Sequence, residues 1–439
     1  HEWLAQVLFA LSYRLGNLDG VVLLCALVLA LTFSLVFKGS YARSKSILIS
    51  LGMTVLAAAV ASVHWLARPH IFTLLFTVLW VGELEKWRQN KPWRWWLLPI
   101  IMLAWVNTHG AFIVGILTWL IYLAGSIISG KLFPGMKVFG ESTDGSSPVN
   151  YSPNKKLFLV GIPILIATLI NPVGWRVWST TFGFLQNKYL VSHTVEYQAP
   201  DFQLASFWPF LAMICLSILL TALSRKRLPV IAVLLLLSWT AFSLVSARNI
   251  AIYAVIAAPI MAGIAASNLR DNQFSAGILG FDERLKLVDA RLAGKVWPLI
   301  FCILISFVLI YGVGRSTGSS RNRFSENVFP VEAVDWIVEH PSAEPIFNYF
   351  PWGGYLLHRM WPEGKVFIDG QTDFYGESLT RQYEKVITLA NGWQQVVENY
   401  QVGRVLMPSD SELVERLQLL DGWQVVYVDQ TAAVLDYHP

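Results

Sequence analysis

The chain has 439 residues, of which 55% are hydrophobic and only 14% are charged. Several apolar runs reach the roughly 20 residues that cross about 30 Å of hydrocarbon, so the composition excludes an ordinary soluble protein and indicates an integral membrane protein. The net charge of +4 requires no nucleic-acid partner, because Lys and Arg beside membrane segments explain it. All three cysteines fall inside apolar runs, which argues against a disulfide framework or a cysteine metal site.

The first elements predict a polytopic, mainly α-helical bundle. Residues 3–15 are apolar but short, and Gly16 and Gly20 follow them, so we expect an amphipathic helix at the membrane interface. Ten membrane-length segments come next. The expected crossings are 20–37, 46–66, 70–85, 95–107, 110–129, 157–171, 204–223, 228–246, 250–268 and 296–313.

Charge predicts the orientation of this bundle. Alternate connections between the segments are rich in Lys and Arg, whereas the others carry only Arg68, Arg176, Lys188 and Arg248. By the positive-inside rule, the richer side is cytoplasmic. We therefore expect the hairpin tip at 105–115, and everything after residue 313, to be extracytoplasmic.

The sequence changes character after residue 313. A polar linker over 314–328 precedes a segment, 329–439, in which short apolar runs alternate with helical patterns. The sequence thus predicts a transmembrane domain over 1–313 and a small soluble α/β domain over 329–439. Its expected helices are 331–340 and 377–390, and its expected strands are 345–349, 365–369, 403–408, 423–429 and 432–437.

Unusual polar residues gather at the helix ends on the expected outer side. Ionisable groups within spanning segments cost about 2.5–3.5 kcal/mol on insertion scales, so they generally pair or line a wet cavity. Arg248 stands between two long apolar runs, where it suits a phosphate that it holds bidentately. We expect an outward-open cavity formed by His1, Glu2, Arg68, Pro69, His70, Asn107, Thr108, His109, Asn171, His193, Glu196, Arg248 and Asn249.

These positions also have structural interpretations. Asn107 to His109 are suited to cap two helix ends, and Arg68 is suited to anchor a helix end at the interface. Glu2 suits a base or a cation ligand, and it equally suits the start of a helix as a favourable N-terminal acid. The sequence leaves both interpretations open.

Eight stretches resemble a widespread set of bacterial membrane proteins that look like glycosyltransferases of the GT-C fold. They are HEWLAQVLFALSYRLG, RPHIFTLLF, LAWVNTHGAFIVG, INPVGWRVW, VEYQAPDF, SARNIAIY, PIFNYFPWGGYLL and KVFIDGQTDFYG. The resemblance implies a bundle in the bacterial inner membrane that transfers a sugar from a polyprenyl-phosphate donor at the outer face. It places the principal catalytic acid in a first outer loop, so we expect the chain to be N-terminally truncated.

The resemblance implies roles for individual residues. HEWL stands where relatives carry an (H/K)PPL motif, which makes Glu2 and His1 the catalytic candidates. In such an enzyme the donor phosphate is held near the interface by Arg248 and Arg68, supported by His70, His109 and Asn107.

A weaker similarity joins PWGGYLLHRMWPEGKVFIDG to the WWDYG region of oligosaccharyltransferases, with Gly353 in place of the Asp of that motif. It implies that the soluble domain meets the acceptor through exposed loops. The alternative is that Gly353 opens a helix and that Asp369 lies in a turn. The acceptor-binding candidates are Glu196, Trp352, Tyr355, Asp369 and Asp373.

Cofactor and partners are expectations of the same kind. Glu2, Glu196, His1 and His193 offer ligands to a divalent cation, but their spacing is not diagnostic, so metal use stays open. The expected partners are the lipid bilayer, the lipid-linked sugar and a glycan, lipid or protein acceptor.

Alternative functions are a transporter or flippase of a lipid-linked solute and a non-catalytic membrane protein that binds an envelope partner. Transporters usually place polar residues near the midplane and often show repeats, and neither feature is visible in the sequence.

Overall fold

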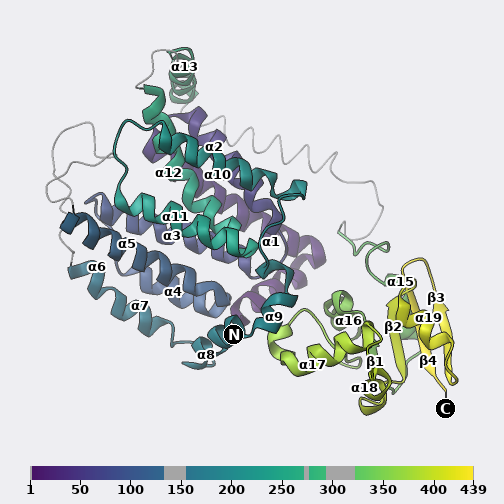
Figure 1. Cartoon of the computed structure of the whole chain (residues 1–439). Helices are drawn as coiled ribbons and strands as arrows, with labels where there is room; N and C mark the ends of the chain where they lie inside the picture. The colour runs from purple at the N-terminus through teal and green to yellow at the C-terminus, as the bar shows by residue number, and fades with distance from the viewer. Residues whose placement is uncertain (1, 133–154, 271–275, 293–321, 439) are drawn as a thin grey trace. The chain divides into compact units, whose positions relative to one another are not determined.

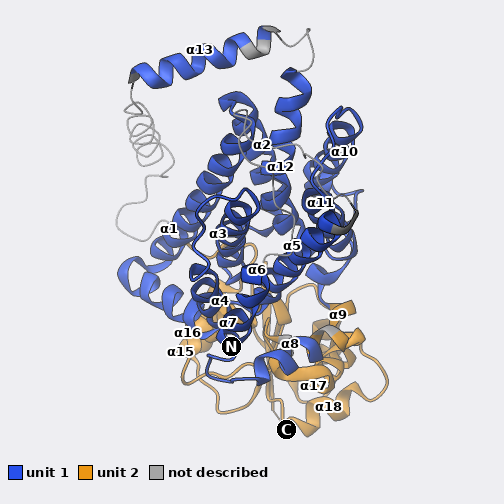
Figure 2. Ribbon diagram, turned by 90° about the vertical axis from the view of Figure 1, so that its left-hand side faces the viewer, with its two compact units in different colours: residues 1–183, 194–321 blue, residues 184–193, 322–439 orange. Residues whose placement is uncertain are grey.

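The computed structural model describes residues 2–132, 155–270, 276–292 and 322–438. Within these residues the protein is mainly helical, with a four-stranded sheet near its C-terminus (Figure 1). It divides into two compact units, coloured blue and orange in Figure 2. Unit 1 comprises 1–183 and 194–321, and unit 2 comprises 184–193 and 322–439. The short segment 184–193 thus belongs to unit 2, although its neighbours in the chain belong to unit 1.

Unit 1 is a helical bundle. Its α-helices are α1 (Trp3–Ser44), α2 (Ile47–Ala61), α3 (His70–Arg88), α4 (Leu97–Thr108), α5 (Ile113–Leu132), α6 (Lys155–Leu159), α7 (Gly161–Ala167), α8 (Arg176–Gln186, whose last residues fall in unit 2), α10 (Trp208–Ala222), α11 (Val230–Val245), α12 (Ile250–Arg270) and α13 (Ala276–Leu292). Short 3-10 turns join them at η1 (Ser62–His64), η2 (Gly110–Phe112), η3 (Val195–Tyr197), η4 (Ala205–Phe207) and η5 (Ala247–Asn249).

Five helical segments in the described part of the chain are long and apolar enough to cross a membrane, which identifies a membrane protein. They are Trp3–Ser44, Ile47–His64, Gly110–Gly130, Ala205–Ala222 and Ala247–Arg270. The helices α4 and α11 are apolar but shorter. The expectation of ten crossings is therefore not supported, and the expected crossing at 296–313 lies outside the described residues.

Particular residues explain two of these differences. The C-terminal half of α3 carries Glu83, Glu85 and Lys86, so this helix is too charged for an apolar span. The expected crossing at 157–171 is broken into α6 and α7. Gly161 at this break packs so closely on the indole of Trp119 that an added Cβ would lie 2.5 Å from Cζ2.

The expected interfacial helix and the first expected crossing form the single helix α1. Its backbone leaves helical geometry at Gly16 and at Asn17, where φ is 51°. A left-handed residue of this kind interrupts the hydrogen-bond ladder, so the helix kinks there. The kink falls where the sequence predicts the end of the short helix.

Helix α12 forms the centre of unit 1. It packs against α1, α2, α3, α10 and α11, and almost all of its residues are buried. A helix that is apolar on every side is buried in a protein core or in a membrane, and the many alanines of α12 let its neighbours approach closely. Its position fixes η5, which directly precedes it and carries Arg248.

A buried network of charges connects α1, α3 and α5. Oε2 of Glu85 lies 2.7 Å from NH2 of Arg43 and 2.9 Å from Nε of Arg88. The hydroxyl of Tyr122 donates to Oε1 of the same carboxylate over 2.6 Å. Because a buried charge without partners is strongly destabilising, this network fixes how the three helices sit against one another.

Unit 2 is an α/β domain, as the sequence predicts. Its sheet contains β1 (Ile346–Asn348), β2 (Arg404–Pro408), β3 (Trp423–Val428) and β4 (Ala432–Tyr437), in the order β1-β2-β4-β3. Strand β1 runs parallel to β2, and β4 is antiparallel to both β2 and β3. The helices are α9 (Lys188–His193), α15 (Val331–Glu339), α16 (Gly353–Met360), α17 (Thr372–Ile387), α18 (Trp393–Asn399) and α19 (Glu412–Gln418), with the 3-10 turn η7 (Phe350–Trp352).

Both faces of this sheet are covered, because successive strand residues point to opposite sides. Val405 and Met407 of β2 belong to a core shared with α17, α18 and α19. Leu406, between them, belongs to a second core shared with α15 and α16. Two buried faces explain why β2 and β4 are nearly continuous apolar runs.

The expected strand at 365–369 does not form. The buried side chain of Asn348 takes the hydrogen bonds that a neighbouring strand would supply. Its Oδ1 accepts from the N–H of Phe367 over 2.8 Å, and its Nδ2 donates to the carbonyl of Ile368 over 2.9 Å. The side-chain amide of Asn348 thus takes the backbone hydrogen bonds of Phe367 and Ile368 without a β-ladder. Hydrophobic alternation alone does not reveal such a contact.

Candidate functional site

The polar hairpin tip between α4 and α5 is buried in unit 1. Helix α4 ends at Thr108, His109 is extended, and η2 begins at Gly110. Asn107, Thr108 and His109 are 7%, 1% and 4% exposed, although the residues around them are apolar. Buried polar groups of this kind need hydrogen-bond partners, and their partners show what each residue does.

Asn107 connects three parts of unit 1. Its Oδ1 accepts from Nε1 of Trp3 over 2.7 Å. Its Nδ2 donates to the carbonyls of Leu103 and Ile170, both over 2.8 Å. These three bonds tie the start of α1 to α4 and to the segment after α7, so the amide has a clear structural role.

His109 is the centre of the polar cluster. Its Nε2 lies 2.8 Å from NH2 of Arg248, and its Nδ1 lies 2.8 Å from Oγ1 of Thr73. An arginine only donates, so Nε2 accepts and the ring proton is on Nδ1, which donates to Thr73. Thr73 also accepts from Nε1 of Trp105 over 2.9 Å. His109 is therefore a neutral imidazole whose tautomer is set by its two neighbours.

Arg248 is a half-buried cation held by neutral groups. Besides His109, its guanidinium donates to the hydroxyl of Tyr197 and lies over the ring of that tyrosine, 5.0 Å from its centroid. No carboxylate of the described residues forms an ion pair with it. A guanidinium has five N–H donors, so these contacts orient it and leave donors for an anion.

Glu2 lies beside this cluster. Its Oε1 accepts from the N–H of Gly110 over 3.2 Å and is 3.6 Å from Nε2 of His109. It is the N-cap residue of α1, but its side chain does not cap that helix. The carboxylate is instead directed to the hairpin tip, with its side chain 30% exposed. A carboxylate and an unpaired guanidinium thus flank one neutral imidazole.

The other predicted residues form neighbouring contacts in the same unit. Arg68 pairs with Glu196 at the surface, and Nε2 of His70 donates to the carbonyl of His64. His64 in turn donates from Nε2 to the carbonyl of Ala247 over 2.9 Å, beside Arg248. The loop of Glu196 joins η5, where Ser246 donates to its carbonyl over 3.2 Å. These bonds connect residues 64–70, 194–198 and 246–249.

The structure therefore brings Glu2, His109 and Arg248 into one cluster. Arg68 and Glu196 satisfy each other, which makes Arg68 a weaker candidate for an anion than Arg248. His1 lies outside the described residues. The hydrogen-bonding residues Thr73, Trp105 and Tyr197 are not among the residues that the sequence predicts for the site. Thr73 follows His70 by three residues on α3, and Tyr197 follows Glu196 directly. Helical spacing from one predicted residue and adjacency to another are therefore the only features of the sequence that point to Thr73 and Tyr197.

Unit 2 corrects one expectation about the acceptor-binding candidates. Trp352, Tyr355 and Asp369 are only 4%, 4% and 5% exposed, so they are not residues of exposed loops. Nε1 of Trp352 donates to the carbonyl of Val328 over 2.8 Å, and Asp369 accepts from the N–H of Gln371 over 2.8 Å. The side chain of Asp373, in α17, lies outside the described part of the structure.

His193 is also placed in unit 2. Its Nε2 lies 3.4 Å from Oε1 of Glu384 on α17, and its ring packs on that of Tyr189, with centroids 4.1 Å apart. Among the described residues, no three His, Cys, Asp or Glu side chains form a group that would hold a metal ion.

Comparison with known proteins gives no further assignment. No protein-family model matches the chain, and no curated protein sequence matches it.

Proposed function

We propose that the protein is a membrane glycosyltransferase that takes a sugar from a polyprenyl-phosphate donor and transfers it to a cell-envelope acceptor. The observation that carries the proposal is Arg248, a half-buried guanidinium held by the neutral groups of His109 and Tyr197. A charge kept without a carboxylate partner in an apolar bundle favours an anionic ligand. A lipid phosphate supplies that anion, and its polyprenyl tail suits a protein of apolar helices.

Each residue of the cluster has a distinct part in this reaction. Arg248 binds the phosphate and stabilises the charge that grows on it as the bond to the anomeric carbon breaks. His109 positions Arg248. Glu2 deprotonates the acceptor hydroxyl or orients a metal ion, the two options that the sequence leaves open. Arg68 and His70 belong to residues 64–70, which His64 connects to the carbonyl of Ala247 beside Arg248, and they support the headgroup from there.

Location and acceptor follow from the same proposal. The resemblance implies a bacterial inner membrane, and the positive-inside rule applied to the sequence supports a cluster at its outer face and a unit 2 outside the cytoplasm. There the acceptor is a glycan, lipid or protein of the envelope. Since Trp352, Tyr355 and Asp369 are buried, they would shape the acceptor surface of unit 2 rather than contact the acceptor.

The test is donor turnover in proteoliposomes. The purified chain is incubated with a panel of polyprenyl-phosphate hexoses, and the release of polyprenyl phosphate is measured. Arg248→Gln should lower turnover by roughly 10²–10³-fold, the usual effect of removing one group that stabilises developing charge. Arg225→Gln is the matched control, because Arg225 is an exposed arginine of unit 1 outside the cluster. Equal loss in both variants, or no donor turned over, would overturn the proposal.

A flippase for a lipid-linked solute is the second candidate, and one observation favours it. Thr77, Trp80, Thr118, Trp239 and Ser243 have buried polar atoms without a hydrogen-bond partner among the described atoms. They lie on α3, α5 and α11, of which α5 packs against the other two. Buried polar groups inside a helical bundle are typical of transport pathways. Movement of a fluorescent lipid-linked sugar between leaflets, without release of polyprenyl phosphate, would favour this candidate.

A further inference from the structure

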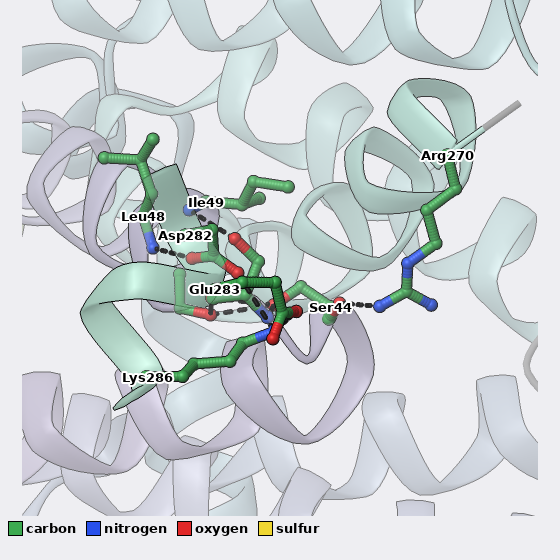
Figure 3. Close-up of polar contacts among 9 residues, drawn as sticks. Ser44, Leu48, Ile49, Arg270, Asp282, Glu283 and Lys286 are labelled. Atoms are coloured by element: carbon green, nitrogen blue, oxygen red, sulfur yellow. Dashed lines mark hydrogen bonds and ion pairs between the residues drawn. The ribbon is translucent and has the colours of Figure 1, made fainter. Parts of the chain in front are cut away.

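The helix α13 is attached to the end of unit 1 where α1 ends and α2 begins (Figure 3). Oδ1 of Asp282 accepts from the backbone N–H of Leu48, in the first turn of α2, over 3.0 Å. Arg270, the last residue of α12, donates from NH2 to the carbonyl of Ser44 over 2.9 Å. Because α1, α12 and the segment formed by α2 and η1 are all of membrane length, the level at which they end is a membrane surface. The bond to Asp282 holds α13 at that level.

This helix lies across the bundle instead of extending it. Figure 2 shows α13 running crosswise at the end of unit 1, beyond the ends of α2 and α12. Figures 1 and 2 both place it at the opposite end of unit 1 from the start of the chain. A helix that lies crosswise at the end of membrane-length helices is parallel to the membrane plane.

The outward side of α13 combines apolar and basic residues. Successive residues turn by about 100°, so Phe281 and Val288 share one stripe and Arg284 and Arg291 share the adjacent one. Leu287 lies on the far side of the arginines. Phe281, Leu287 and Val288 are 52%, 59% and 51% exposed. A helix with exposed large apolar residues interleaved with arginines is typical of binding at a lipid interface.

The charge of this surface is positive. Glu283 is exposed, but Nζ of Lys286 lies 2.7 Å from its carboxylate and 3.1 Å from that of Asp282. Arg284 and Arg291 form no ion pair with an acid of the described residues. The same is true of Lys45, the exposed residue that ends α1 next to the contact with Asp282. Lys286 thus engages Asp282 and Glu283, whereas Arg284, Arg291 and Lys45 are exposed.

We propose that α13 and Lys45 form a binding surface for the anionic headgroups of the adjoining lipid leaflet. Arg284, Arg291 and Lys45 contact the phosphates, and the side chains of Phe281 and Val288 enter the boundary between headgroups and acyl chains. The Asp282 contact makes this surface a fixed part of the bundle. In the orientation that the sequence predicts, the leaflet is the cytoplasmic one, which is the richer in anionic lipid.

The experiment places an environment-sensitive fluorophore on α13 of the full chain. Cys25, Cys215 and Cys302 are replaced by Ser, Val288→Cys is labelled with NBD, and the protein is reconstituted in phosphatidylcholine nanodiscs with increasing phosphatidylglycerol. We expect a blue shift that grows with the anionic lipid. An Arg284→Gln, Arg291→Gln double variant should weaken the apparent lipid affinity roughly fivefold for each charge removed.

Two controls make the result decisive. A label at Ala290→Cys, an exposed position on the side away from the Phe281 stripe, should shift less than a label at Val288. An Arg225→Gln, Lys226→Gln variant removes the same net charge from another loop and should leave the response of Val288 unchanged. An NBD emission wavelength at Val288 that does not change with the phosphatidylglycerol content would overturn the proposal. An Arg284→Gln, Arg291→Gln variant that keeps both wild-type thermal stability and wild-type lipid affinity would also overturn it.

Discussion

The guanidinium of Arg248 donates from NH2 to Nε2 of His109 over 2.8 Å, so an arginine and a neutral imidazole form the centre of the candidate site. This pairing orients the cation without cancelling its charge. A carboxylate in the place of His109 would hold the guanidinium equally well, but it would leave no net charge for a phosphate. The identity of residue 109 therefore bears directly on the proposed function.

Two substitutions at His109 separate orientation from charge. His109→Gln keeps a neutral acceptor for Arg248, whereas His109→Glu supplies an anionic one. We expect binding of a polyprenyl phosphate to be roughly ten- to a hundredfold weaker in the Glu variant than in the Gln variant, since hydrogen bonds to charged groups contribute about 1.5–3 kcal/mol. Titration of each purified variant with the lipid phosphate measures this difference. Equal affinities would show that Arg248 does not bind the phosphate.

Thr73 supports this pair from α3. Its hydroxyl accepts from the buried donors of His109 and Trp105, so Thr73→Val leaves both unpaired in an almost isosteric change. Each unpaired buried donor costs about 1–3 kcal/mol, and the melting temperature in detergent should fall accordingly.

The control for Thr73 lies one turn further along α3. Thr77 is equally buried, but its hydroxyl has no hydrogen-bond partner among the described atoms. Thr77→Val should therefore be neutral or stabilising. If both variants melt at the same temperature, the hydrogen bonds of Thr73 contribute nothing to stability.

The sequence predicts the members of this cluster better than their arrangement. Glu2, His109 and Arg248 stand out because each is a polar residue beside long apolar runs, and the cost of burying such groups makes them informative. Thr73 and Trp105 are missed because Thr and Trp within an apolar helix look like ordinary core residues. Only the packing of α3 against α4 brings the Thr73 hydroxyl to both His109 and Trp105.

The ten expected crossings are not supported among the described residues, and the charge within α3 gives one reason. Hydropathy over 70–85 is high, but a membrane-length stretch of α3 also takes in Glu83, Glu85 and Lys86, so the helix is too charged for an apolar span. In unit 2, the alternation over 365–369 predicts a strand, whereas the side chain of Asn348 satisfies that segment. In unit 2 a tertiary contact thus overrides a local pattern.

Two adjacent glycines in unit 2 give a test of close packing. A Cβ on Gly353 would lie 2.3 Å from the carbonyl oxygen of Ile368, whereas one on Gly354 would meet no atom within 4 Å. Gly353→Ala should therefore destabilise unit 2 by about 1–3 kcal/mol through overpacking. Gly354→Ala, in the same helix α16, should be neutral or stabilising by up to about 1 kcal/mol.

Limited proteolysis of the full chain, followed by the release of fragments from residues 322–438, would report these two substitutions. Faster cleavage is expected for Gly353→Ala alone. Similar cleavage of both variants would mean that the segment of Ile368 moves aside without cost. The glycine at 353 would then have no packing reason to be there, and its place in the WWDYG-like stretch would need another explanation.

The attachment of α13 should depend on pH through Asp282. Burial raises the pKa of this carboxyl, but the hydrogen bond from Leu48 N–H and the contacts with Lys286 and Ser46 outweigh it, so the pKa lies below its usual range. The other charged groups at the contact are Glu283 on α13 and Arg270 on α12. Because the folded-state pKa is depressed, the carboxylate stabilises the attachment above its ordinary pKa near 3.8. That stability is lost as the pH falls through the folded value.

A spin label at Ala290→Cys, with the native cysteines replaced, would follow this transition. Label mobility should be low at neutral pH and should rise only as the pH falls below the ordinary Asp value near 3.8, because the pKa of Asp282 is depressed. Asp282→Asn lacks the titrating group, so its label should be more mobile already at neutral pH and respond little to acid. Glu283→Gln removes an exposed neighbour and should keep the wild-type transition. A full acid transition in Asp282→Asn would assign the pH dependence to another group and remove Asp282 as the anchor of α13.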